Sequence, residues 1–540
     1  MQDAGRRAAY LAAYDLLEGV QSESRTLAFG RLPAARAQAH AHGWTEVELV
    51  LDAAHLIHDL VSPTASLTRD DVTPMCRRAE AAGLPALFAV ALAIRALAAG
   101  DDAVSLMADA SRAVALLDDA SQPPLDRCTG YVVAAAAFNT LRLLELVDDL
   151  YTRAQELGKH CEVPAQAAAI AVNRVLTRVE WAVALLENGE PAECRARLAQ
   201  AADAVPDALA LDLPPLWRRD VLALGVVARL LDGGRDELLP DLEDLRRSLA
   251  EDGDVEVLPL LDASVALALW RSGDQAAAVA ACDRLSLFTS ATSGSQSFPS
   301  WVRAEVLGGI ESTVSVRAQA SHAALLSRLR WQSRQAVLLA ARTQIRAERW
   351  GADHDRLVHA ANTDPLTGLQ NRRAFDGWLT QAQPAGPRAT ALLLIDVDEF
   401  KRVNDGHGHH SGDEVLRRIG RLLLSAVRPG DLAIRHGGDE FAVLITDAGL
   451  TPAAAEHRAR ELLQAIVTAV WHDIAPGLAV TASIGMAVTS STCDPLGPGE
   501  LYRAADRALY AAKRRSSGLV VADADAPRDD DVAELRPAVG

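Results

Sequence analysis

The pattern of hydrophobic and polar residues divides the chain into three regions. From residue 1 to about 310, Ala and Leu dominate, and apolar residues recur at helical spacing without a strand-like run. Residues 314–361 contain no Gly or Pro before Gly351, which predicts one long helix with a break near that glycine. From Asp364 onward, short apolar runs alternate with amphipathic segments. We therefore expect a multidomain protein with an all-α region, a connecting helix and a C-terminal α/β domain.

The first region contains a recurring turn motif rich in glycine and acidic residues. Each copy separates two amphipathic runs, and a pair of helices cannot bury its apolar face without stacked neighbours. The copies are AAGDD (98–102), a weaker VDDL (147–150), ENGEP (187–191), DGGRDE (232–237) and RSGDQ (271–275). The pattern resembles tetratricopeptide repeats, with a longer period than their usual ~34 residues. It predicts a helical-repeat solenoid over residues 1–313 with a sensory or docking role, and an irregular helical bundle is the alternative.

Residues 314–361 carry apolar side chains near heptad spacing. The seam consists of Leu325, Leu329, Ala336, Leu339 and Trp350, and polar residues interrupt it. Such a seam is typical of a coiled coil. One interpretation is a dimerising stalk that transmits a state between domains, and the other is a solvated connector helix.

Composition and charge narrow the class of protein. The net charge of −18 argues against nucleic acid as the main partner. The six cysteines are far apart and form no CxxC pair, which predicts reduced, buried thiols. The N-terminus lacks the features of a signal peptide, and the most apolar segment, 86–100, contains Arg95 and predicts a buried helix. We expect a cytoplasmic protein without membrane insertion.

The first candidate functional residues of the third region lie in the segment ALLLIDVDEF (391–400). The apolar run 391–395 predicts a buried strand, and Asp396 and Asp398 follow at its end on one face. Carboxylates at such a position suit a hard divalent cation that also binds substrate phosphates.

A second segment, IRHGGDEFAVLI (434–445), reads as a hairpin with its tip at the two glycines. Glycine lets a phosphate or base approach the backbone closely and tolerates positive φ. If the hairpin pairs beside the first strand, Asp439 and Glu440 join Asp396 at one end of the sheet. That arrangement would support an in-line phosphoryl displacement with two metal ions.

Five motifs in chain order then resemble the diguanylate cyclases of the GGDEF family. They are DPLTGLQNRR (364–373), DVDEFKRVNDGHGHHSGDEVL (396–416), RHGGDEF (435–441), TASIGMA (481–487) and ADRALYAAK (505–513). The resemblance covers residues 362–522 and implies a palm-like α/β fold related to nucleotidyl cyclases, with an antiparallel-containing central sheet. An acidic tail, 523–540, is predicted to be disordered.

The resemblance also implies roles for individual residues. Asp396, Asp439 and the carbonyl of Val397 would hold Mg²⁺ (or Mn²⁺), Asp439 would also act as the base, and Glu440 would support it. The substrate-binding set would be Lys401, Asn404, His409, Asp413, Gly437, Gly438 and Lys513. Within it, Asn404 and Asp413 would read guanine, and the two lysines would bind phosphates. Ser517 stands where the family often has an arginine, so Arg514 or Arg515 would replace it.

RPGD (428–431) precedes the hairpin. By itself it is typical of an exposed Pro-Gly turn. At this spacing it resembles the inhibitory site of the family, where Arg428 and Asp431 would bind the cyclic dinucleotide product. The histidines of GHGHH (406–410) suggest zinc, but the resemblance places this loop near the nucleotide instead.

The resemblance implies that two GTP molecules condense to cyclic di-GMP and two pyrophosphates. Each domain would contribute one GTP, so the active form would be a homodimer. Two other functions remain open: a catalytically weak cyclic di-GMP receptor, and a scaffold whose repeat region docks a protein partner.

Overall fold

The structure is a computed structural model that divides into two compact units, residues 1–352 and 353–540. It describes residues 2–21, 25–62, 66–100, 102–159, 162–234, 239–251, 256–285, 297–310, 314–380, 389–428, 430–447, 450–489, 497–514 and 518–522. The predicted tail 523–540 therefore lies outside the described residues.

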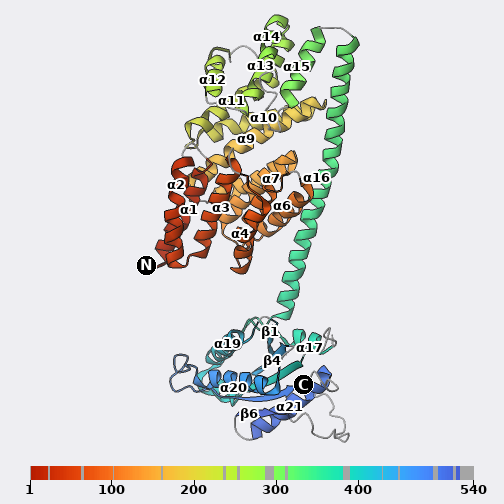
Figure 1. The fold of residues 1–540 in the computed structure, drawn as a ribbon. Coiled ribbons are helices and arrows are strands. Elements are labelled where there is room, and N and C mark those ends of the chain that lie inside the picture. The colour runs from red at the N-terminus through yellow and green to blue at the C-terminus, as the bar shows by residue number, and fades with distance from the viewer. Residues whose placement is uncertain are drawn as a thin grey trace. The chain divides into compact units, whose positions relative to one another are not determined.

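The described part of the first unit is built from helices (Figure 1). They are α1 (Gln2–Gly19), α2 (Arg25–His42), α3 (Thr45–Val61), α4 (Arg69–Ala81), α5 (Pro85–Leu97), α6 (Ala103–Leu117), α7 (Pro124–Thr140), α8 (Leu144–Gly158), α9 (Pro164–Glu187), α10 (Pro191–Leu209), α11 (Pro215–Leu231), α12 (Leu239–Glu251), α13 (Val257–Ser272), α14 (Gln275–Leu285) and α15 (Ser297–Ile310). α16 (Val314–Asn362) begins in this unit and ends in the second.

Three of the predicted turn motifs separate consecutive helices. Gly100, Gly189 and Gly273 lie after α5, α9 and α13 with φ values of 58°, 77° and 88°. Glycine ends a helix in this left-handed conformation without steric strain. DGGRDE follows α11, although residues 235–237 lie outside the described residues.

The prediction of a turn at 147–150 is wrong, because this segment lies inside α8. The chain turns earlier, between α7 and α8, where Arg142 takes a φ of 56°. Because Arg142 adopts the left-handed conformation in place of a glycine, no glycine marks this turn in the sequence. The two acids of VDDL are residues of the amphipathic helix α8.

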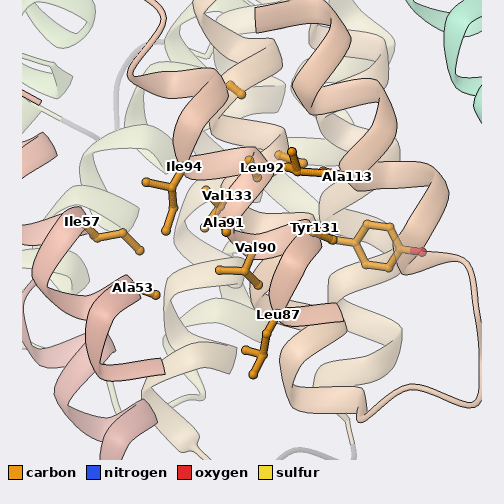
Figure 2. Close-up of a cluster of buried hydrophobic side chains, with 14 of the residues drawn as sticks. Ala53, Ile57, Leu87, Val90, Ala91, Leu92, Ile94, Ala113, Tyr131 and Val133 are labelled. Atoms are coloured by element: carbon orange, nitrogen blue, oxygen red, sulfur yellow. The ribbon is translucent and has the colours of Figure 1, made fainter. Parts of the chain in front are cut away.

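The core of the first unit confirms that the most apolar segment is a buried helix. Leu87, Val90, Leu92 and Ile94 of α5 point into a cluster with side chains of α3, α6 and α7 (Figure 2). Arg95 lies on the same helix and donates two hydrogen bonds to Asp109, at 2.9 and 2.7 Å. The charge inside this apolar segment is therefore paired.

Four of the cysteines are buried with free thiols (Cys76, Cys128, Cys194 and Cys282), and Cys161 and Cys493 lie outside the described residues.

α16 continues through Gly351, so the predicted break at this glycine is wrong. A single glycine costs a helix interior only about 1 kcal/mol relative to alanine, and the good helix formers around it compensate. Leu338, Ala341 and Ile345 bury one face of α16 against the first unit. In contrast, the five seam residues are exposed.

The second unit is built on a six-stranded mixed sheet in the order β1-β3-β4-β2-β5-β6. The strands are β1 (Gln370–Asn371), β2 (Ala389–Val397), β3 (Leu432–Gly437), β4 (Glu440–Asp447), β5 (Ala482–Val488) and β6 (Gly518–Val521). The helices are α17 (Arg372–Thr380), α18 (Phe400–His407), α19 (His409–Ala426), α20 (Pro452–Thr468) and α21 (Pro498–Arg514). Central β2 is antiparallel to both β4 and β5, while the two outer pairs are parallel.

Helices cover both faces of the sheet, and for this reason the sequence of β2 is a continuous apolar run. Leu393 and Ile395 pack into a cluster with α19 and α20, whereas Leu392 and Leu394 pack with α17 and α21. Alternate side chains of a strand point to opposite faces. Every residue of β2 is buried, as the sequence predicted for 391–395.

Among the helices that the structure describes, none combines the length and the apolar character needed to span a membrane.

Candidate active site

The site is built where β2 leaves the core beside the tip of the β3–β4 hairpin. Asp396 is the penultimate residue of β2 and lies opposite Glu440, the first residue of β4. The next amide, from Val397, donates to the backbone carbonyl of Asp439 at 3.2 Å. The predicted pairing therefore exists, and it brings Asp396, Val397, Asp439 and Glu440 to one end of the sheet.

The two glycines make the hairpin tip narrow and open. Gly437 pairs with Glu440, so Gly438 and Asp439 form the two-residue loop, and Gly438 has a φ of 46°. No protein atom lies within 4 Å of the position that a Cβ would take on either glycine. The backbone here is accessible to a ligand, as predicted.

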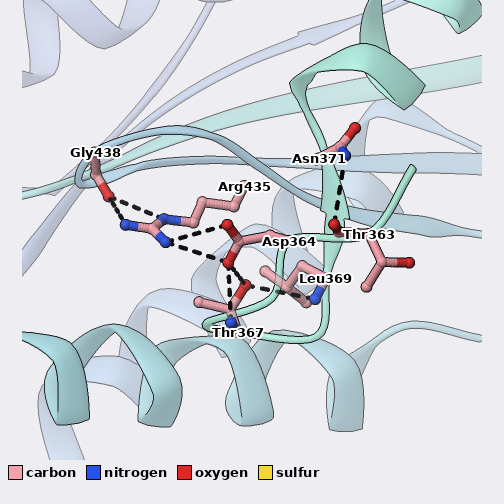
Figure 3. A network of polar contacts seen from close by, with 7 residues as sticks. All are labelled: Thr363, Asp364, Thr367, Leu369, Asn371, Arg435 and Gly438. Atoms are coloured by element: carbon pink, nitrogen blue, oxygen red, sulfur yellow. Dashed lines mark hydrogen bonds and ion pairs between the residues drawn. The ribbon is translucent and has the colours of Figure 1, made fainter. Parts of the chain in front are cut away.

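Arg435 holds this tip in place from the irregular end of β3 (Figure 3). Its guanidinium donates to the carbonyl of Gly438 at 3.0 and 2.8 Å and to Asp364 at 3.2 Å. Asp364 in turn accepts hydrogen bonds from the backbone and hydroxyl of Thr367. The DPLTG segment thus anchors the hairpin, which is a role for Arg435 that sequence reasoning missed.

The carboxylates at this end of the sheet are partly neutralised by a lysine from α21. The Nζ of Lys513 donates to Oδ2 of Asp396 at 2.6 Å. Burial raises the pKa of the Asp396 carboxyl, Lys513 opposes this rise, and the charges of Asp439 and Glu440 add to it. The three carboxylates therefore lie within electrostatic range of one another, and Lys513 supplies a cation to the cluster.

Asp398 does not share the role of Asp396. Its carboxylate accepts hydrogen bonds from the hydroxyls of Thr481 and Ser483, each at 2.7 Å. Its backbone amide donates to the carbonyl of Thr481 at 3.0 Å. These contacts fasten the end of β2 to β5, so Asp398 positions the strand end.

The residues predicted to read guanine lie on α18 and α19. The side chain of Asn404 lies so close to Gly412 that a Cβ there would overlap its Oδ1 atom. Asp413 is the next residue and is half-buried. Gly412 therefore allows Asn404 to lie beside the helix that carries Asp413, whereas Lys401 and His409 are exposed on α18 and at the start of α19.

A cavity of about 710 Å³ opens beside Asp396 and Lys513. Arg402, His407 and Thr481 also line it. Its volume lies within the range of small-molecule sites, about 300–1,000 Å³. Arg402 and His407 come from the segment that resembles the guanine-binding motif of the family.

A family model described as "Diguanylate cyclase, GGDEF domain" matches residues 361–518. Residues 361–518 are a GGDEF domain. The matched range contains every residue of the predicted catalytic, metal, substrate and inhibitory sites.

Curated relatives support the GGDEF assignment. The probable diguanylate cyclase DgcT of Escherichia coli is 40% identical over 163 residues, which is 30% of this chain and 35% of the relative. The response regulator PleD of Caulobacter vibrioides is 38% identical over 194 residues, or 34% of this chain and 41% of the relative. The chain thus spans less than half the length of these two relatives.

Solved structures include the coiled coil and GGDEF domain of DgcB from Caulobacter crescentus in complex with c-di-GMP. The two chains are 26% identical, and the match covers 34% of this chain and 97% of the DgcB chain with a TM-score of 0.30. A score of this size carries no argument about the fold of the whole chain.

The donor set of the GGDEF domain fits a magnesium ion that also binds phosphates. Within the described part of the chain, no group of three or more His, Cys, Asp or Glu side chains forms a preformed metal site. Mg²⁺ usually takes only one or two carboxylates and completes its coordination with water and substrate phosphates. Asp396, Asp439 and the Val397 carbonyl, which lie at the same end of β2, would provide such a set.

Arg428, Gly430 and Asp431 of the RPGD segment lie within the described residues of the GGDEF domain, whereas Pro429 does not. Asp431 accepts a hydrogen bond from the amide of Arg428 at 3.0 Å, and Gly430 has a φ of 102°. The Asp431 carboxylate is 5% exposed and forms an ion pair with Arg458 of α20 at 2.6 Å. The Arg428 side chain is exposed. Sequence reasoning missed Arg458, because only the fold brings α20 beside this turn.

The predicted replacement for the missing arginine is only partly visible. Arg514 is the last residue of α21 and is exposed, while Arg515 and Ser517 lie outside the described residues.

Proposed function

We propose that this chain is a diguanylate cyclase that condenses two GTP molecules into cyclic di-GMP and two pyrophosphates. The observation that carries the proposal is the cluster of Asp396, Asp439 and Glu440 at the end of β2, with Lys513 2.6 Å from Asp396. An acidic cluster beside an open glycine turn and a lysine suits nucleotide phosphates and a divalent cation.

The chemistry follows from the residues at this end of the sheet. Asp439 would accept the proton of a ribose 3′-hydroxyl, whose oxygen then attacks the α-phosphate of the other GTP. Pyrophosphate leaves with its electron pair, and the same step repeated in the opposite sense closes the ring. Lys513 and Lys401 would bind the phosphates, and Asn404 with Asp413 would select guanine. Bound Mg²⁺ or Mn²⁺ would stabilise the negative charge that develops on the phosphates.

The reaction requires two GGDEF domains that face each other, and α16 offers a surface for dimerisation. Leu325, Leu329, Leu339 and Trp350 are 48%, 51%, 68% and 80% exposed. These are the seam positions of the predicted coiled coil, and the opposite face of α16 is already buried. We therefore propose a homodimer that pairs along this seam.

We also propose that the RPGD turn binds the product. The Arg428 side chain is exposed, and Arg458 contacts the Asp431 carboxylate of the same turn. Guanidinium groups suit both phosphates and the guanine edge. The cyclic dinucleotide bound there would inhibit the enzyme.

The remaining assignments concern the rest of the chain. We propose that residues 1–313 are a tetratricopeptide-like sensory or docking domain with a protein partner, that 314–361 transmit its state, and that the cyclase domain spans 362–522. The paired helices around Gly100, Gly189 and Gly273 support the repeat interpretation.

The decisive experiment measures cyclic di-GMP formed from GTP and Mg²⁺ by purified full-length protein. Asp439→Ala is expected to lower the rate at least a thousandfold while leaving the thermal transitions unchanged, because only the acid at the hairpin tip is removed. Glu461→Ala, at an exposed acid of α20, is the matched control. Undiminished product from Asp439→Ala contradicts the mechanism, and a wild-type protein that binds cyclic di-GMP without making it is a receptor.

Product inhibition is tested separately by adding cyclic di-GMP to the same assay. Arg428→Ala is expected to raise the inhibitory concentration at least tenfold with little change in the uninhibited rate, because the turn is remote from the proposed chemistry. Arg421→Ala, at an exposed arginine of α19, serves as the control. An unchanged inhibition curve for Arg428→Ala removes the RPGD site from the proposal.

A further inference from the structure

A second cavity, of about 590 Å³, lies in the first unit. It is located where α16 passes the neighbouring helices, whose ribbons Figure 1 shows. One wall is formed by α16 and the others by α6, α8, α9 and α10. Its volume is that of a site for a small molecule. The catalytic chemistry uses no residue of this cavity.

The charge of the lining has the opposite sign to that of the chain. Five arginines and three acids line the cavity, whereas the chain as a whole has a net charge of −18. Arg342, Arg346 and Arg349 come from α16, and Arg153 and Arg197 come from α8 and α10. A local cationic site in an acidic protein attracts anions that the remaining surface repels.

Two of the three acids already have cationic partners. Glu145 accepts a hydrogen bond from Arg334 at 2.6 Å, and Asp149 from Arg153 at 3.1 Å. Burial favours the neutral form of Glu145, but the hydrogen bond from Arg334 holds its pKa below the usual range. The third acid, Glu193, is exposed on α10.

The three arginines that α16 contributes to the cavity have fewer direct contacts. Arg349 forms an ion pair with Asp118, a carboxylate that also binds Arg153 at 2.9 Å. Arg342 and Arg346 are exposed, and the charge of Arg342 acts on Glu145, helping to lower the pKa of that carboxyl. Like charges four residues apart on a helix repel each other. Their neighbour Ile345 is 4% exposed, so packing holds both arginines at the mouth of the cavity.

We propose that this cavity binds a small polyanion with two or more phosphate groups. Positions 342, 346 and 349 share one helix face. Along the helix axis, position 346 lies about 6 Å from position 342, and position 349 lies about 10 Å from it. One phosphate cannot span that distance, but a chain of phosphates or a nucleotide polyphosphate can. The planar guanidinium fork matches phosphate oxygens, and Arg197 faces the same space from α10.

Such a ligand would join α16 to the helical domain. It would neutralise the repulsion between Arg342 and Arg346 and contact α10 at the same time. Occupancy of the cavity would therefore stabilise the packing of α16 on the first unit. The seam residues Leu339 and Trp350 lie on the same part of α16, so the ligand would act next to the proposed dimer surface.

The test is calorimetric titration of full-length protein with inorganic tripolyphosphate in buffer that contains EDTA. Without a divalent cation, the carboxylates near Asp396 disfavour polyphosphate at the catalytic centre, so one class of site is expected. Arg342→Gln/Arg346→Gln should weaken binding at least tenfold, because two of the five cations of the lining are lost. Arg328→Gln/Arg330→Gln, at exposed arginines of α16 outside the cavity, should change it less than twofold.

Two further measurements locate the site. Inorganic phosphate should bind much more weakly than tripolyphosphate, because it reaches only one or two arginines. Tripolyphosphate should slow amide hydrogen exchange in residues 338–352 of wild-type protein but not in the double variant. The proposal is overturned if wild-type protein does not bind tripolyphosphate, if both double variants bind it equally, or if protection appears only in the GGDEF domain.

Discussion

At the scale of single residues, Glu18 shows how burial couples this fold to pH. Its side chain lies in α1 and the residue is only 6% exposed. Burial raises the pKa of Glu18 to about 7, and the charge of Asp15 adds to the shift. Since the folded state holds this proton more tightly than the unfolded state, the stability that Glu18 contributes is complete below about pH 4.5. It is lost as the pH rises through 7.

Glu18→Gln is therefore expected to stabilise the first unit at high pH. Glutamine stays neutral, so the gain in unfolding free energy at pH 8 should be about 2 to 3 kcal/mol, and it should be near zero at pH 4. Scanning calorimetry at both pH values measures the difference. Asp203→Asn, at an exposed acid of α10, should show no such pH dependence. An equal gain for Glu18→Gln at both pH values contradicts the assignment.

The residues of the site differ in how far the sequence predicts them. Asp396, Asp439 and Glu440 stand in motifs next to apolar strand runs, so local pattern places them correctly at one sheet end. Arg435 begins the RHGGDEF motif without an assigned role, and Arg458 stands in an ordinary helix. Their partners, Asp364 and Asp431, are distant in the chain, and only tertiary packing assigns a role to these arginines.

At the scale of elements, Gly485 shows how closely β5 and α21 pack. A Cβ at this position would collide with the backbone nitrogen of Leu509 and the carbonyl oxygen of Ala505. Backbone atoms cannot move aside as the end of a side chain can. The contact therefore fixes the distance of α21 from the sheet, and α21 carries Lys513 to the proposed catalytic cluster.

Gly485→Ala is expected to destabilise the GGDEF domain by about 3 kcal/mol, because the added methyl group forces α21 outward. Cyclic di-GMP formation should fall at least tenfold at temperatures where the domain stays folded, because Lys513 moves with the helix. Gly499→Ala is the matched control, since no atom lies within 4 Å of its Cβ position. Thermal unfolding and the cyclase assay test both effects, and normal activity for Gly485→Ala contradicts the argument.

Element prediction from the sequence succeeded where periodicity and turn chemistry agree. The buried strand at 391–395 and the turns at Gly100, Gly189 and Gly273 were predicted because apolar runs and glycines mark them. The prediction of elements failed where glycine alone was taken to mark a helix break or a turn. Gly351 is accommodated inside α16, and the turn before α8 uses Arg142 in a conformation that arginine rarely adopts.

At the scale of the whole molecule, the proposed dimer depends on one stripe of α16. Leu329→Glu/Leu339→Glu places charges in the seam and should convert a dimer into a monomer, as measured by light scattering. The cyclase rate should fall more than tenfold at low micromolar protein concentration, because each domain holds only one GTP. Leu222→Glu, at an exposed leucine of α11, is the control. If the seam variant stays dimeric, the two chains pair elsewhere.

The ion pair between Lys513 and Asp396 has a consequence for the order of ligand binding. A divalent cation that arrives alone must compete with the ammonium group and offers it no other partner. A nucleotide offers its phosphates to the same ammonium group. Nucleotide and cation should therefore bind cooperatively, each raising the affinity of the other by the same factor. The lysine would thereby keep the centre from trapping free cations between turnovers.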